Sequence, residues 1–220
     1  MAIVQRIQEY GPRLRFGGAV LASVLLLGAC TSSYTYIKNS SVKTYFKVPN
    51  NWQIFDENQI FKSQISGLSP QGEAAAKASI WMVAFDANPK PSLNHFFSGS
   101  SPYPQGFAQV RQLSEEQKDS ISLGSIRNTV FPLNQLQVQD PTSVEFLQND
   151  DLVLQGGIHG NRIIFNVRLG DTFYTVNQTG LVNPQTSLLY LFVIGCEAHC
   201  YLNHKRTIDE IVKSWTVRER

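Results

Sequence analysis

Alternating and continuous apolar segments recur along the chain and predict a protein built largely from β-strands. From Val42 to Val48, every second residue can face a core while the residues between them face solvent, which is the pattern of a half-buried strand. Two other segments, Ala78–Phe85 and Leu188–Ile194, are almost continuously apolar over the length of one strand. Such runs are typical of central strands that are covered on both faces. We therefore expect a sheet with a layer on each side.

Further short apolar segments are separated by turn residues, which predicts a series of neighbouring strands. The links His159–Asn161 and Leu169–Asp171 contain the glycines that tight turns need. Links this short make neighbouring strands antiparallel. A glycine pair, Gly156–Gly157, falls inside one expected strand, where a bulge is the usual reason. The expected strands are Trp52–Phe55, Phe107–Leu113, Val144–Leu147, Leu152–Ile158, Arg162–Arg168 and Thr172–Asn177.

Helix start signals show where the covering layers are to be expected. Ser114–Gln117 and Thr207–Glu210 both have the capping-box pattern. The first predicts a helix that Pro132 ends, and the second predicts a helix whose apolar residues share one face. Shorter helices are expected at 56–66 and at Ser92–Phe97. Together these elements predict an α+β fold in which an antiparallel sheet is flanked by helices on both faces.

Residues 1–29 have the pattern of a signal peptide. Arg13 and Arg15 precede an uncharged run of eleven residues, Gly17–Leu27. As a helix this run would be about 16 Å long, which is too short for a hydrocarbon core of roughly 30 Å. The run ends in a Leu-Gly-Ala-Cys sequence at Cys30, which resembles the lipobox of bacterial lipoproteins.

The lipobox resemblance implies a covalent lipid on Cys30 and cleavage before it. Each buried methylene of an acyl chain contributes about 0.8 kcal/mol, so two or three chains hold a protein firmly on a membrane. We expect a lipid-anchored protein on the extracytoplasmic side of the cell membrane. In a two-membrane cell the outer membrane is the alternative, because Thr31 is not the aspartate that signals inner-membrane retention. An ordinary secretory signal and an uncleaved anchor are the other interpretations.

The mature chain is predicted to form one domain. Cleavage leaves 191 residues, which suits a single core. The polar segment 30–41 is expected to be a lipid-proximal tether, and 42–220 the globular domain. Cleavage also removes three arginines and one glutamate, which leaves 16 basic and 16 acidic residues. This formally neutral chain gives no support for nucleic-acid binding.

Cys196, His199, Cys200 and His204 form the one cluster with candidate metal ligands. Outside the cytoplasm, two cysteines that remain after lipidation are expected to oxidise together. Their spacing matches no common zinc pattern, and a bridge over so small a loop would stabilise the fold by about 2 kcal/mol. We expect a Cys196–Cys200 disulfide, with a metal site made by these four residues, or a redox-active pair, as alternatives.

No set of catalytic residues is evident from the sequence. A nucleophile elbow would need a G-x-S-x-G sequence, and Gly67–Gln71 lacks the last glycine. His95 and His159 fall beside expected loops, where a surface or capping role is the usual one. We expect no catalytic residue and no cofactor besides the lipid on Cys30. An envelope enzyme with a shallow site is the alternative.

Two segments, Phe46–Trp52 and Ile208–Val217, resemble PsbP-like proteins. This group includes extrinsic photosystem subunits, the Ran-binding Mog family and LpqN-type bacterial lipoproteins. The resemblance implies an antiparallel sheet between helices and a non-enzymatic binding or accessory module, which would serve a protein partner or a cell-envelope component. It carries over no functional residue. The Cys196–Cys200 pair departs from the pattern of the group.

Overall fold

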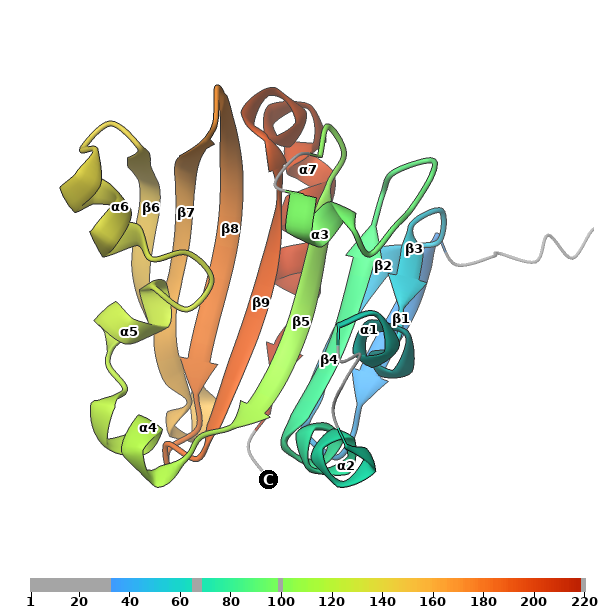
Figure 1. Cartoon of the computed structure of the whole chain (residues 1–220), viewed down its shortest axis with the longest axis vertical. Helices are drawn as coiled ribbons and strands as arrows, with labels where there is room; N and C mark the ends of the chain where they lie inside the picture. The colour runs from blue at the N-terminus through green and yellow to red at the C-terminus, as the bar shows by residue number, and fades with distance from the viewer. Residues whose placement is uncertain (1–32, 65–68, 99–100, 219–220) are drawn as a thin grey trace, which may run out of the picture. The chain divides into compact units, whose positions relative to one another are not determined.

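The computed structural model describes residues 33–64, 69–98 and 101–218 (Figure 1). The residues from Ser32 to Arg220 form one compact unit. The expected signal peptide, residues 1–29, and the expected lipidation site Cys30 lie outside the described residues.

The strands of the described chain form two antiparallel sheets. The smaller sheet has the order β1-β2-β10 and contains β1 (Tyr34–Asn39), β2 (Thr44–Pro49) and β10 (Thr216–Val217). The larger sheet contains β3 (Gln53–Phe55), β4 (Ile80–Asp86), β5 (Gln105–Gln112), β6 (Val144–Val153), β7 (His159–Leu169), β8 (Thr172–Val182) and β9 (Leu188–Glu197). Its order is β3-β4-β5-β9-β8-β7-β6.

Helices of very different length cover the larger sheet. The longest is α7 (Ala198–Ser214). The others are α1 (Glu57–Gln64), α2 (Pro70–Ser79), α3 (His95–Ser98), α4 (Glu115–Ser120), α5 (Leu123–Arg127) and α6 (Leu133–Gln139), with a single 3-10 turn at Gln155–Gly157.

The larger sheet is covered on both faces, as the continuous apolar runs predict. Helix α7 and the smaller sheet lie on one face, and α1, α3, α5 and α6 lie on the other (Figure 1). Every residue of β9 from Leu189 to Ile194 is buried. The expected α+β fold with an antiparallel sheet between helices is thus confirmed, with one addition. Strand β2, expected in the main sheet, belongs to a separate small sheet that shares one covering layer with α7.

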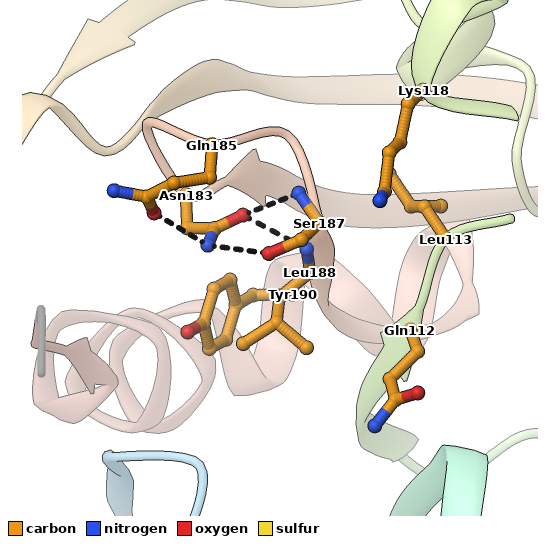
Figure 2. A pocket seen from close by; sticks show the side chains of 8 residues that line it. All are labelled: Gln112, Leu113, Lys118, Asn183, Gln185, Ser187, Leu188 and Tyr190. Atoms are coloured by element: carbon orange, nitrogen blue, oxygen red, sulfur yellow. Dashed lines mark hydrogen bonds between the residues drawn. The ribbon is translucent and has the colours of Figure 1, made fainter. Parts of the chain in front are cut away.

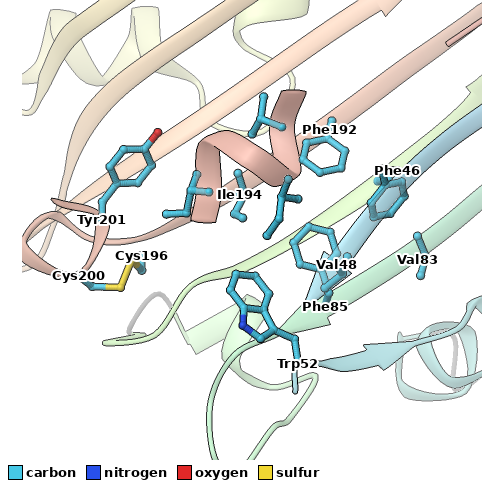
Figure 3. Close-up of a cluster of buried hydrophobic side chains, with 14 of the residues drawn as sticks. Phe46, Val48, Trp52, Val83, Phe85, Phe192, Ile194, Cys196, Cys200 and Tyr201 are labelled. Atoms are coloured by element: carbon cyan, nitrogen blue, oxygen red, sulfur yellow. A yellow bond between two sulfur atoms is a disulfide. The ribbon is translucent and has the colours of Figure 1, made fainter. Parts of the chain in front are cut away.

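An aromatic cluster joins that covering layer to the main sheet (Figure 3). The ring of Phe192 in β9 lies edge-on to Phe46 of β2, with ring centroids 5.2 Å apart. Phe85 of β4 contacts the same ring, with centroids 5.8 Å apart. Ile208 and Ile211 of α7 are fully buried in the same cluster. Burial of large apolar side chains contributes about 1.5–3 kcal/mol each, so this cluster is the main attachment of α7 and β2.

The expected tether 30–41 is wrong over half of its length, because it contains β1. This strand pairs with β2 in antiparallel register, from Tyr34 opposite Pro49 to Asn39 opposite Thr44. Ile37 packs against the aromatic cluster, whereas most of the other side chains of the strand are exposed. Because only one apolar side chain of β1 packs against the core, its sequence shows no alternation of apolar and polar residues. The strand is recognised in the structure by its pairing with β2.

The helix near the C-terminus begins nine residues earlier than the sequence indicates. Thr207–Glu210, expected to be its first turn, lies inside α7, which starts at Ala198. The apolar face is confirmed, since Ile208, Ile211 and Val212 are buried. The capping-box pattern was misleading because serine, threonine and glutamate are also tolerated within a helix that tertiary packing holds.

The second half of the main sheet has fewer and longer strands than expected. Val144–Leu147 and Leu152–Ile158 are not separate strands. Strand β6 continues from Val144 through the first expected segment and ends at Val153, the second residue of the other, with an irregularity between Phe146 and Gln148. His159–Asn161, expected to be a turn, is the start of β7.

The turn between β6 and β7 lies instead at the two glycines that the sequence placed in a strand. Gly156 and Gly157 have φ values of 81° and 79°, which side chains with a Cβ rarely adopt. The expected turn at Leu169–Asp171 is confirmed, with Gly170 at a φ of 63°. The chain reverses at the glycines whose φ is positive, Gly156, Gly157 and Gly170, and not at Gly160 in the other expected turn.

The helices before residue 140 also differ from the expectation. The capping box at Ser114 is confirmed, but the single helix expected from there to Pro132 is divided into α4 and α5, because Ser122 forms a second cap. Pro132 precedes α6 and does not end a helix. Helix α1 begins after Asp56 as predicted, and residues 65 and 66 of its expected end lie outside the described residues.

Helix α2 is not among the helices that the sequence predicts, because Pro70 and Gly72 at its start are residues that usually break a helix. Proline at the first helical position loses no hydrogen bond, and the Ser69 hydroxyl accepts one from the Gly72 amide at 3.1 Å. The expected strand Ala78–Phe85 consequently begins two residues late, at Ile80.

Close packing at Gly106 predicts a selective loss of stability. A Cβ there would lie 2.6 Å from Phe85 Cε2 and would also press on the backbone oxygen of Val193. We expect Gly106→Ala to lower the free energy of unfolding by about 1–3 kcal/mol, measured by urea denaturation. Gly124→Ala in α5 is the control, because the nearest atom, Ser122 Oγ, is 3.6 Å away. Equal stability losses in the two variants would contradict the packing argument.

Candidate functional site

A groove with an apolar lining lies on the face of the main sheet opposite α7. Two adjoining cavities of about 280 and 110 Å³ share Phe96, Phe107 and Val130 as lining residues. We call them together the sheet groove. Figure 1 shows the helices of this face in two groups, with α1 and α3 on one side and α5 and α6 on the other. The remaining lining residues are Ile60, Met82, Ala84, Leu93, Gln105, Gly106, Gln109, Thr129, Phe131, Leu169, Tyr174, Val176, Leu191, Val193 and Gly195.

The two-residue period of the strands places these side chains in the groove. In β5, Phe107 and Gln109 face the groove, while Ala108 and Val110 belong to core clusters on the opposite face. The small side chain of Ala84 on the neighbouring strand β4 adds little bulk to the floor. The groove therefore follows from side-chain size on the central strands together with a gap between two helix groups.

One wall of the groove is held in place by a buried carboxylate. Asp86, at the end of β4, is fully buried and accepts hydrogen bonds from the Asn88 amide at 2.8 Å and the Ser92 amide at 3.1 Å. His95 Nδ1 lies 2.7 Å from Asp86 Oδ2. These contacts attach the segment that carries Leu93 to the sheet. His95 thus has a structural contact here.

The polar atoms in the lining are few, and some are already bonded. The Gln105 amide nitrogen donates to the His95 carbonyl oxygen at 3.1 Å. The Tyr174 hydroxyl accepts a hydrogen bond from the Ser101 amide at 2.7 Å. Gln109 and Thr129 are the other polar side chains. Among the described residues, no aspartate, glutamate, lysine, arginine or histidine lines either cavity. The groove therefore favours an uncharged and largely apolar ligand.

A second, more polar pocket of about 500 Å³ lies where β5 and β9 meet the β8–β9 connection (Figure 2). Its central residue is Asn183, whose side-chain oxygen accepts from the backbone amides of Ser187 and Leu188, each at 2.8 Å. The side-chain nitrogen of Asn183 donates to Gln185 and to the Ser187 hydroxyl, each at 2.9 Å. Lys118, on its rim, pairs with Glu115 of the same helix, α4. These polar groups hold a loop together and form no reactive set.

The cysteine cluster is a disulfide in the structure. Cys196, at the end of β9, is joined to Cys200, in the first turn of α7 (Figure 3). Both are buried in the aromatic cluster. His204 Nδ1 lies 3.8 Å from the Cys200 sulfur, and this sulfur is not a thiolate because it is bonded to Cys196. His199 is exposed and lies near Asn203. In this state neither sulfur can bind a metal as a thiolate.

Groups with a shifted pKa lie outside the groove. Burial raises the pKa of Glu57 and of Tyr201. A hydrogen bond to a carboxylate raises the pKa of Tyr34 and of Lys205, and hydrogen bonds from a neighbouring threonine lower the pKa of Asp140. None of these five lines either cavity of the groove.

Within residues 33–64, 69–98 and 101–218, no three histidine, cysteine, aspartate or glutamate side chains are grouped as a metal site would need. In the same part of the chain, no helix combines the length and the hydrophobicity that a membrane crossing demands.

Comparison with solved structures identifies the fold. The solution structure of cyanobacterial PsbP (CyanoP) from Synechocystis sp. PCC 6803 matches with a TM-score of 0.52 and 14% identity, over 87% of this chain and 96% of that chain. LpqN of Mycobacterium tuberculosis, involved in cell envelope biogenesis, matches with a TM-score of 0.46 and 13% identity, over 84% of this chain and 91% of that one. The chain thus has a PsbP-like fold, as the resemblance implied.

More distant similarity extends to the Saccharomyces cerevisiae Ran-binding protein Mog1p, with a TM-score of 0.41 and 8% identity, over 84% of this chain and 95% of that one. Comparison of the sequence with known family models and with curated proteins gives no match. At these identities the structural similarity establishes the fold alone.

The sheet groove was missed by sequence reasoning. Its floor residues lie in segments that the apolar pattern assigned to buried strands, and nothing in that pattern distinguishes a covered strand from one with a gap above it. One local signal was present, since Asp86 directly follows an apolar run and such a buried carboxylate needs several donors.

Removal of the disulfide should destabilise the domain measurably. For so small a loop, the chain-entropy estimate gives about 2 kcal/mol. We expect a Cys196→Ala, Cys200→Ala variant to lose about this much free energy of unfolding in a denaturant titration. A reductant should lower the stability of the native chain by a similar amount and leave the variant unchanged. If the native chain unfolds identically with and without reductant, the bridge contributes no stability.

Proposed function

We propose that this protein is a lipid-anchored, extracytoplasmic binding protein whose domain holds an apolar ligand in the sheet groove. The observation that carries the proposal is the groove itself, whose described lining is apolar and contains no charged side chain. An apolar ligand that enters an uncharged concave site is bound favourably, because its apolar surface is removed from water. The proposed ligand is a component of the cell envelope, because the lipidated Cys30 would keep the protein there.

A binding role fits the groove better than a catalytic role does. Hydrolysis or group transfer needs a nucleophile, a general base or a charge-stabilising group close to the bound substrate. The polar side chains of the groove are two glutamines, a threonine and a tyrosine. The Gln105 amide nitrogen and the Tyr174 hydroxyl already have hydrogen-bond partners in the protein, whereas Gln105 Oε1 is buried without a hydrogen-bond partner among the described residues. The enzyme alternative therefore has no support from this site.

Membrane anchoring is supported by the lipobox pattern at Cys30 and by the oxidised cysteine pair. A disulfide persists outside the cytoplasm, where lipoproteins reside. Only residues 31–33 separate Cys30 from β1. Such a short connection spans at most about 14 Å when extended, so a lipid on Cys30 would keep the domain close to the membrane surface.

Anchoring is tested by following the mass and the location of the chain in bacterial cells. The native chain should lose residues 1–29, gain acyl chains on Cys30 and fractionate with membranes. Cys30→Ser should abolish acylation and cleavage at this site, because hydroxyl oxygen does not replace the thioether sulfur. Cys200→Ala keeps the N-terminal segment intact and serves as the control. An unacylated native chain that retains Met1 in the cytosol would refute the proposal.

Ligand binding in the sheet groove is tested with Nile red, an uncharged dye that fluoresces in apolar sites. Residues 32–220, the compact unit of the chain, should bind the dye with saturation. Ala84→Trp fills the groove floor and should reduce binding at least about tenfold. Ala74→Trp adds the same ring on the exposed surface of α2 and should bind as the native domain does. Equal binding by both variants would place the dye elsewhere.

A further inference from the structure

Over β5 and β9, the floor of the sheet groove offers no free backbone groups to a ligand. Strand β5 is paired with β4 and β9, and β9 is paired with β5 and β8. Strand β4 is paired with β5 along its whole length, but β3 pairs only with its residues 84–86, so in the described chain residues 80–83 have a strand partner on one side alone. Recognition over β5 and β9 therefore depends on side chains, and these are mostly apolar.

An extended peptide is a poor match for this surface. Each residue of a peptide brings one donor and one acceptor that need partners when buried, and strand addition supplies them only at the edge of a sheet. Of the side chains that the structure describes, only Gln109 and Thr129 are polar in the larger cavity. A peptide along the floor would leave most of its backbone groups unpaired, each at a cost of free energy.

A helix satisfies its own backbone but is too wide for the cavities. With side chains a helix is about 10 Å in diameter, so a cavity of about 280 Å³ holds less than one turn of it. The smaller cavity, of about 110 Å³, holds still less. Only single side chains of a helix could enter.

A hydrocarbon chain has neither the unpaired polar groups of an extended peptide nor the width of a helix. It needs no hydrogen bonds and no countercharge. The lining contains no charged side chain that would lose hydration when covered by hydrocarbon. The absence of charge also implies that a lipid headgroup stays outside the groove, in water.

We propose that the sheet groove binds one acyl chain of a membrane lipid, with the headgroup outside. The inference rests on the proposed function, since a protein anchored through Cys30 meets lipid as its nearest apolar ligand. Met82 and Ala84 of β4, Phe107 of β5 and Leu191 of β9 form the floor against which the chain packs. The role is that of a protein that takes up a lipid at the membrane surface.

The proposal is tested in cells that express the full chain and are fed a fatty acid with a photoreactive diazirine. After illumination, mass spectrometry of the purified protein should find adducts with the mass of a complete membrane lipid. We expect these adducts on peptides that contain groove residues, above all Met82 and Phe107. The same spectra report whether Cys30 carries acyl chains, so the anchoring proposal is assessed independently.

A matched pair of variants on β5 provides the control. Gln109→Glu places a carboxylate in the groove with almost no change in shape, and should reduce groove adducts at least about tenfold, because hydrocarbon would then cover a charge. Gln112→Glu makes the same change on an exposed residue of the strand, outside the groove, and should leave the adducts unchanged. Unfolding measurements on both variants show whether the fold is intact.

Three results would overturn the inference. The first is an acylated Cys30 without adducts in the groove, and the second is a set of adducts that Gln109→Glu does not reduce. Either result would show that the groove holds no lipid, while the anchoring proposal stands. A crosslink between a groove peptide and the peptide of Cys30 would show that the anchor of the protein itself, and not a separate lipid, occupies the site. A chain without acyl groups on Cys30 would refute the anchoring proposal instead.

Discussion

Packing of the Phe192 ring between the main sheet and its covering layer is the contact on which the rest of this structure depends. Phe192 lies on β9, in the centre of the sheet, and contacts Phe46 of the small sheet and Phe85 of β4. A central strand that is apolar on both faces must be covered on both, because its side chains otherwise remain in water. Helix α7 and the small sheet meet this requirement on one face through a continuous core.

On the opposite face, the apolar side chains of the sheet are covered less completely, and the sheet groove lies where they remain partly open. Short helices cover it in two groups, and Ile126 and Leu133 are the fully buried anchors of α5 and α6. Between the groups, Phe107 and Val130 are only half-buried. Apolar surface left open in this way is costly in water unless a ligand covers it, which gives the groove its proposed role. The same constraint thus accounts for the rigid layer on one face and the binding site on the other.

Much of the fold was predictable from the chain alone, because it depends on local pattern. The continuous apolar run at Leu188–Ile194 identified the central strand, and the one-sided apolar pattern after Thr207 identified the buried face of α7. Errors occurred where a partner decides the structure. Strand β1 is held by pairing with β2, and the turn at Gly156 is defined by a positive φ that the sequence does not reveal. The candidate site was not predictable, since it combines residues from seven helices and strands.

By itself, the sequence determined the class of the fold, the alternation of exposed and buried strands, and the cysteine pair that forms a disulfide. These properties depend on the chemistry and spacing of neighbouring residues, which the chain carries in any conformation. Only the tertiary structure decided that Ala84 and Phe107 face an open groove. The groove depends on side chains brought together from distant segments, and no local pattern records such distances.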